Sequence, residues 1–134
     1  MRELREIIVH CSFTRPDQDI GVQEIRRWHL ERGFNDIGYH YVIRKNGRLE
    51  IGRDIRKPGA HTKGHNDFSI GICLIGGMGW DSEALDDYSE EQLLTLRHTI
   101  NALMTIGNLK LSGHRDYTNR KTCPNFNVRE WYNS

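Results

Sequence analysis

Two histidines and one cysteine stand where the chain leaves or follows short apolar runs. His10 ends the run that begins at Glu6, His114 follows the run 108–112, and Cys123 lies nine residues further on. Zinc accepts imidazole nitrogen and thiolate sulfur in tetrahedral geometry, and three protein ligands leave a fourth position open, as in catalytic sites. A water in that position has its pKa lowered to about 7 and supplies a nucleophile at neutral pH. The set predicts a zinc hydrolase.

Each member of this set also has an ordinary interpretation. A histidine at a strand end is often a hydrogen-bonded residue of the core or rim, and a cysteine is often simply buried. Cys73 lies inside an apolar run, and Cys11 alternates to the face opposite His10, so we assign both cysteines to packing. Residue type and position alone leave the metal site and simple burial both open.

The remaining histidines divide in the same way. His29 and His98 lie in segments with helical spacing and are expected at the surface or its boundary, and His40 is expected on a strand. His61 belongs to a glycine-containing loop, 59–65, of the kind that lines a cleft. A role in the site and an ordinary position in a loop are equally supported for His61.

The elements that must position these residues follow from the hydrophobic pattern. Apolar, β-branched runs at 6–10 and 69–74 predict buried strands. The runs 39–43 and 49–52 are joined through Asn46-Gly47, which predicts an antiparallel hairpin.

Helical spacing begins at Val22 and stops at Gly33, and Ser89 with Gln92 forms a capping box that opens a second helix, closed by Gly107. A short strand then leads to the second histidine of the set, and a short helix ends the chain. The order of elements predicts one α/β domain over residues 1–134, with a central mixed β-sheet flanked by helices.

Composition excludes several classes of protein. The 134 residues suit one domain with one core, and 19 Lys and Arg against 18 Asp and Glu give a formal charge of +1. No basic tail stands apart, so no nucleic-acid partner is expected. The run Ile7–Val9 is too short for a signal peptide or a membrane span, so we expect synthesis in the cytoplasm and no integral membrane segment. Three cysteines are a poor disulfide framework, which favours metal ligation by one of them.

Several segments spread over the chain carry a family resemblance from about Ile7 to Trp131. They are Ile8-Val9-His10-Cys11-Ser12, Gly38-Tyr39-His40-Tyr41, Gly59-Ala60-His61, Ser69-Ile70-Gly71-Ile72-Cys73-Leu74-Ile75-Gly76-Gly77, Gly113-His114-Arg115-Asp116 and Lys121-Thr122-Cys123-Pro124. These segments resemble the type-2 zinc amidases, and among them the amidase-type bacteriophage lysozymes. Members of that group are N-acetylmuramoyl-L-alanine amidases and are relatives of the animal peptidoglycan recognition proteins, whose fold the resemblance implies.

The resemblance implies a role for five residues. His10, His114 and Cys123 match the family's zinc ligands, and Tyr39 and Lys121 match the tyrosine and lysine that assist catalysis in the phage members. The implied substrate is bacterial peptidoglycan, cut between the lactyl group of N-acetylmuramic acid and the first L-alanine. The lysine ammonium and zinc stabilise charge on the carbonyl oxygen, and the tyrosine orients water or moves a proton. Without the resemblance, we would interpret Tyr39 as a residue that packs in a strand and Lys121 as a solvated charge in a loop.

Substrate contacts are expected around the His61 loop. Arg53 precedes this loop and Lys63 lies within it, where cations can bind the carboxylates of the stem peptide, and an ordinary solvated surface is equally supported. Trp80 follows the glycine-rich loop and either stacks on a sugar or anchors that loop. The resemblance predicts a monomeric phage or prophage endolysin that acts on the cell wall after release.

Two rival functions are open at this point. Cys123 can be a nucleophile with His114 as its base, in a metal-free cysteine hydrolase, but His10 then has no task. The chain can also be a recognition module that binds wall fragments without cutting them. Relatives of that kind lose the cysteine ligand, and its presence here favours hydrolysis.

Overall fold

One five-stranded sheet organises the computed structural model, which describes residues 2–78, 85–119 and 121–134. The strand order is β3-β2-β4-β1-β5; β3 runs antiparallel to β2, and the other neighbours are parallel. The strands are β1 Glu6–Cys11, β2 Tyr41–Ile43, β3 Leu49–Ile51, β4 Ser69–Leu74 and β5 Lys110–Gly113, and the α-helices are α1 Val22–Glu31, α2 Glu90–Leu103 and α3 Val128–Tyr132. The predicted α/β architecture with a mixed sheet is confirmed.

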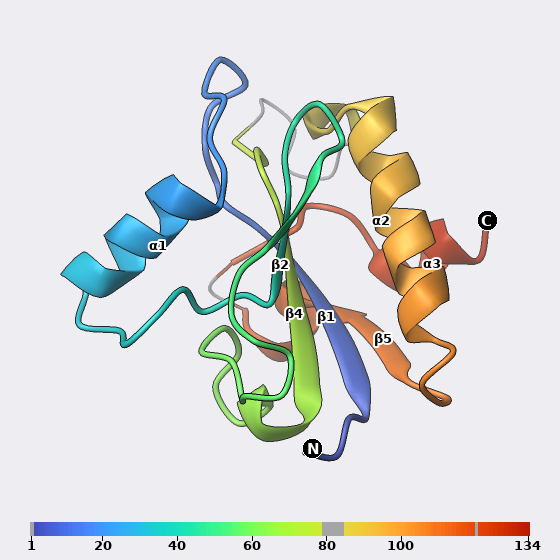
Figure 1. The fold of residues 1–134 in the computed structure, drawn as a ribbon. Coiled ribbons are helices and arrows are strands. Elements are labelled where there is room, and N and C mark those ends of the chain that lie inside the picture. The colour runs from blue at the N-terminus through green and yellow to red at the C-terminus, as the bar shows by residue number, and fades with distance from the viewer. Residues whose placement is uncertain (1, 79–84, 120) are drawn as a thin grey trace.

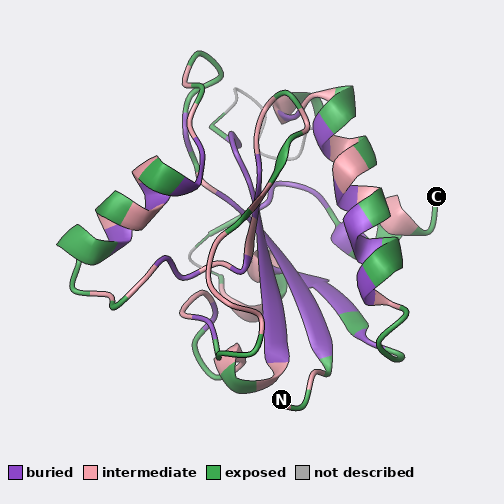
Figure 2. Ribbon diagram, in the orientation of Figure 1, coloured by how far each residue is buried: buried purple, intermediate pink, exposed green. Residues whose placement is uncertain are grey.

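Helices cover both faces of this sheet, with α1 on one side and α2 and α3 on the other (Figure 1). All residues of β1 and β4 are buried, as Figure 2 shows for the two central strands. Alternate side chains of a strand point to opposite faces, so each central strand contributes to both layers. The larger core cluster lies beneath α2 and α3 and includes Ile7, Val9, Ile70, Ile72, Leu74, Leu96 and Ile100.

The same alternation places a group of polar side chains on the face of the sheet opposite α2. Residues 6, 8 and 10 of β1 alternate with the core residues 7, 9 and 11, so Glu6 and His10 share the face opposite α2. The Glu6 carboxylate is buried and accepts a hydrogen bond from the Ser112 hydroxyl at 2.8 Å. His65 contacts the same carboxylate at 3.1 Å. A buried polar layer therefore lies over the centre of the sheet.

The local structures that the sequence predicts at the start of α2 and in the hairpin turn are present. The Ser89 hydroxyl accepts the Gln92 N–H at 3.1 Å, and the Gln92 side chain accepts the Ser89 N–H at 3.0 Å, which completes the capping box of α2. Gly47 has a φ of 88° in the turn between β2 and β3, a conformation that glycine adopts without steric cost. The helix ends at Leu103, four residues before Gly107, and a turn fills the difference.

The strand predicted over 39–43 begins later, at Tyr41. The cause is the side chain of His40, whose Nδ1 accepts the N–H of Gly71 at 3.0 Å. An imidazole thus occupies a place that a backbone carbonyl would take in the ladder, and Tyr39 stands in irregular backbone. No helix within the described residues is long and apolar enough to cross a membrane.

Candidate metal and catalytic site

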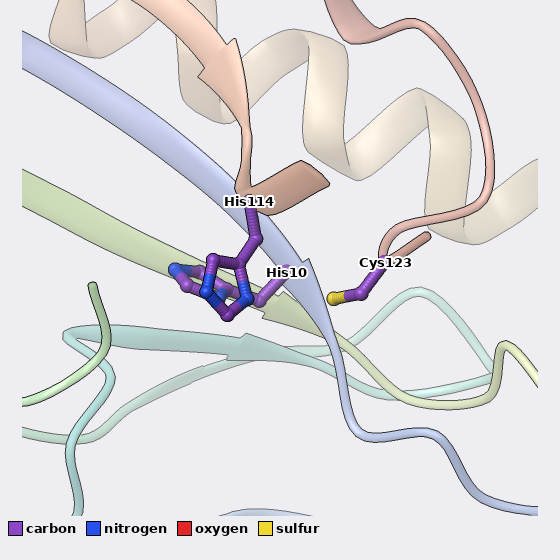
Figure 3. A group of neighbouring side chains, drawn as sticks. All are labelled: His10, His114 and Cys123. Carbon is purple, nitrogen blue, oxygen red and sulfur yellow. The ribbon is translucent and has the colours of Figure 1, made fainter. Parts of the chain in front are cut away.

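His10, His114 and Cys123 converge at one edge of the sheet. His10 lies near the end of β1 and His114 directly follows β5, and because these neighbours are parallel their carboxyl ends share an edge. The imidazole rings of the two histidines have centroids 4.6 Å apart, and the sulfur of Cys123 points toward them (Figure 3). One ligand atom from each of the three residues lies within 4.8 Å of the others.

Backbone contacts hold Cys123 in this position. The Arg115 N–H donates to the Cys123 carbonyl at 2.8 Å and so ties the loop to the residue after His114. The Cys11 N–H donates to the Cys123 sulfur at 2.8 Å. Cys11, which we assigned to packing, is buried in the core and also contacts the candidate ligand. The hydrogen bond between the two thiols, together with burial, raises the pKa of Cys123.

The donor set fits a zinc ion. Burial is the main cause that lowers the pKa of both His10 and His114, so both rings are neutral at pH 7, which is the form that binds a metal. A divalent cation beside the Cys123 sulfur would favour the thiolate that burial alone disfavours. Two neutral imidazoles and one sulfur match the ligands that tetrahedral zinc takes.

Tyr39 and Lys121 lie beside this group. The Tyr39 ring centroid is 5.1 Å from that of His10, and burial raises the pKa of the phenol, which therefore stays protonated as a donor. Lys121 is exposed, and its positive charge contributes to the lowered pKa of His114. An ammonium and a phenol are thus available next to the three candidate ligands.

A cavity of about 500 Å³ opens over these residues. Its walls come from the segment after β1, from α1 and from the segment before α3. The lining residues include Ser12, Phe13, Ile25, Trp28, His29, Arg32, Phe34, Tyr39, His61, His114, Lys121 and Cys123. Four of the five residues to which the resemblance gives a role, Tyr39, His114, Lys121 and Cys123, therefore line one cavity with aromatic and cationic walls. The fifth, His10, contacts the rings of Tyr39 and His114.

The expectation for His29 was wrong, because its side chain is buried rather than at the surface or its boundary. Its Nδ1 accepts the Gly38 N–H at 2.9 Å, and the ring faces the cavity. Helical spacing alone did not show that α1 turns this residue inward. His98, on α2, is exposed as expected.

The three residues predicted to contact substrate differ in their surroundings. His61 lines the cavity, and burial lowers its pKa to about 3. The Arg53 guanidinium donates to backbone carbonyls of residues 36, 37 and 58, so it holds neighbouring loops together. Lys63 is exposed. Neither Arg53 nor Lys63 is among the described residues that line the cavity, and Trp80 lies outside the described residues.

Phe13, which the sequence did not single out, stands in the cavity wall in a strained conformation. Its φ is 54°, in the left-handed region that a bulky residue rarely adopts, and the residue is 59% exposed. The flanking residues are held in place: the Ser12 N–H donates to Leu74 and the Thr14 N–H donates to Gly76.

We expect the free energy of unfolding of Phe13→Gly to exceed that of Phe13→Ala by about 1 kcal/mol, because glycine removes the Cβ clash of the left-handed region while both variants lose the same ring contacts. Chemical denaturation measures the change. Phe13→Ala is the matched control, since it keeps Cβ and therefore the strain. A Phe13→Gly variant no more stable than Phe13→Ala would contradict the strain argument.

Known proteins resemble this chain over most of its length. The profile of the N-acetylmuramoyl-L-alanine amidase family, Amidase_2, matches residues 1–126. The endolysin of Klebsiella phage KP32 is 39% identical over 132 residues, which cover 98% of this chain and 87% of that endolysin. The endolysin of Escherichia phage T7 is 39% identical over 127 residues, which cover 94% and 83%.

Solved structures show the same relationship. The amidase LysC from Clostridium intestinale URNW superposes with a TM-score of 0.82 at 29% identity, over 96% of this chain and 83% of LysC. The group of His10, His114 and Cys123, with Tyr39 and Lys121 beside it, thus lies on a fold that the family profile covers almost end to end. The chain belongs to the N-acetylmuramoyl-L-alanine amidase family.

Proposed function

We propose that this amidase is a zinc-dependent endolysin of phage or prophage origin, which cuts bacterial peptidoglycan between N-acetylmuramic acid and L-alanine. The observation that carries the proposal is the group formed by His10, His114 and Cys123, whose ligand atoms lie within 4.8 Å of one another beside the cavity. The endolysin relatives support the substrate and the type of enzyme.

His10, His114 and Cys123 would hold zinc beside the cavity. The chemistry that zinc supplies when bound is Lewis acidity and a lowered pKa for water. The Lys121 ammonium would stabilise the negative charge that develops on the substrate carbonyl oxygen. Tyr39, which stays protonated, would orient water or donate a proton to the leaving amine.

The walls of the cavity would hold the substrate. We retain His61 and Lys63 as candidate substrate contacts, and Arg32 adds a cation within the cavity itself. Charge-assisted hydrogen bonds from such cations suit the carboxylates of a stem peptide. Arg53 would act indirectly, through the loops that its guanidinium holds.

A metal-free thiol mechanism is disfavoured by the surroundings of Cys123. Burial and the contact with Cys11 raise the pKa of the thiol, whereas nucleophilic cysteines have a lowered pKa. The mechanism would also leave His10, buried in the same group, without a task.

Cell-wall action would follow synthesis in the cytoplasm and release from the cell, with the enzyme as a monomer. The endolysin relatives support this order of events. Gel filtration combined with light scattering would measure the oligomeric state, and a stable dimer would contradict that part of the proposal.

Digestion of purified peptidoglycan tests the proposed reaction. The protein is stripped of metal by a chelator, and samples with and without added zinc are analysed by mass spectrometry. We expect free L-alanine amino termini and intact glycan strands with zinc, and no products without it. New reducing sugars would indicate a glycosidase, and activity that survives thorough metal removal would favour the thiol mechanism.

A further inference from the structure

The imidazole of His61 contacts the imidazole of the candidate ligand His10. The Nδ1 of His61 lies 2.8 Å from the Nε2 of His10, and the two rings meet edge to face at 87°. The other nitrogen of His61, Nε2, lies 3.3 Å from the Ser69 hydroxyl. Both nitrogens of His61 therefore have partners inside the protein, which a residue that only contacts substrate would not need.

Two glycines make room for the His61 ring. A Cβ at Gly71, in the middle of the central strand β4, would lie 2.6 Å from the Cδ2 atom of His61, and a Cβ at Gly59 would lie equally close to that atom. Glycine inside a strand weakens it and often marks a close approach of another group. Here the approaching group is the imidazole of His61.

The backbone of the loop is also fixed. The Asn66 side-chain oxygen accepts the N–H groups of both His61 and Thr62 at 2.9 Å. The Thr62 hydroxyl lies 3.0 Å from the Nδ1 of His61 and 3.3 Å from the Nε2 of His10. The ring of His61 is thus held in place by contacts with the sheet, with its own loop and with His10.

We propose that His61 is a positioning residue: it accepts the Nε2 proton of His10 and so directs the Nδ1 of His10 to the metal. A neutral imidazole carries one proton, and the nitrogen that binds a metal is the one without it. The Ser69 hydroxyl can accept from the Nε2–H of His61, which leaves the Nδ1 of His61 free to accept from His10. Partners of this kind fix the tautomer and orientation of a metal-binding histidine.

This inference rests on the proposed zinc site and adds a role that substrate contact does not require. A substrate contact would change the KM for peptidoglycan and leave zinc affinity unaltered. A partner of His10 changes zinc affinity in the absence of any substrate, by about 10- to 100-fold when it is removed. Zinc affinity therefore separates the two roles of His61.

Two substitutions separate hydrogen bonding from packing. His61→Phe keeps a ring in the space above Gly71 but has no acceptor, and His61→Asn keeps an acceptor near the position of Nδ1. Competition with a chromophoric chelator measures zinc affinity, and thermal unfolding of the metal-free proteins checks that each variant folds. We expect about 10- to 100-fold weaker zinc binding for His61→Phe and about threefold or less for His61→Asn. His98→Phe, on the exposed face of α2, should bind zinc like the wild type.

Wild-type zinc affinity in a folded His61→Phe variant would overturn the role of His61 while leaving the zinc site intact. Failure of the wild-type protein to bind zinc would instead contradict the proposed function. Nitrogen-15 NMR of the wild-type histidines gives an answer that does not depend on any variant. A proton on the Nε2 of His10 is expected, and a proton on its Nδ1 would overturn the inference.

Discussion

Cys123→Ser is expected to lower amidase activity by about a thousandfold or more, because a lost ligand removes several kcal/mol of charge stabilisation and each 1.36 kcal/mol is a factor of ten. Serine is nearly isosteric with cysteine, but its hydroxyl is a much poorer zinc ligand than a thiolate. The backbone hydrogen bond from the Arg115 N–H to the Cys123 carbonyl does not involve the Cys123 side chain, so the fold should survive. Wall lysis and zinc content measured on the same preparation check the prediction.

Cys73→Ala is the matched control for a buried cysteine that is not one of the three candidate ligands. Cys73 is buried in β4 and belongs to the core cluster beneath α1, so its loss should reduce stability and leave the zinc content unchanged. A Cys123→Ser protein that keeps one zinc and normal lysis would overturn the metal assignment. A variant that keeps zinc but loses activity would instead point to a nucleophilic thiol.

The fold was largely predictable because its signals are local. The capping box of Ser89 and Gln92 and the turn at Gly47 each depend on a few neighbouring residues, and both formed as expected. The buried strands were recognisable from continuous apolar runs, which a sheet covered by helices on both faces requires. Parallel pairing then accounts for the meeting of His10 and His114 at one edge.

Contacts between distant side chains were not predictable in this way. The bond between His10 and His61 joins residues 51 positions apart, and the bond from Cys11 to Cys123 joins residues 112 apart. Periodicity indicates which face a side chain takes but not which ring it meets there. The one available signal was Gly71, a glycine inside an apolar run, which indicates close approach of another group.

The start of β2 shows the same limit. Tyr39 follows the alternation of a strand, yet the imidazole of His40 replaces a backbone partner and leaves Tyr39 in irregular backbone near His10. A side chain that competes with the ladder overrides strand propensity, which depends on context. The alternation of polar and apolar residues therefore placed Tyr39 in a strand to which it does not belong, although it located residues 41–43 correctly.

Lys121→Met is expected to reduce kcat by about 100- to 1,000-fold, the usual cost of removing one group that stabilises an oxyanion. Methionine keeps most of the stem length and removes only the charge. Because Lys121 is exposed, the free energy of unfolding should change by less than about 0.5 kcal/mol. Steady-state kinetics on a soluble muropeptide and denaturation curves measure the two effects. Lys110→Met, at the start of β5 and thus at the opposite end of that strand, is the control.

Zinc affinity distinguishes this catalytic role from a structural one. If Lys121 acts only in catalysis, its removal should not weaken zinc binding; if it supports the site, its removal should weaken zinc binding. The Lys121 ammonium lies close enough to lower the pKa of both His10 and His114, so it also opposes a cation bound between them. Its removal should leave zinc affinity equal or higher while kcat falls. Lys121→Arg keeps the charge with a different geometry and should recover part of the activity. Loss of zinc in Lys121→Met would mean that the lysine supports the site rather than the reaction.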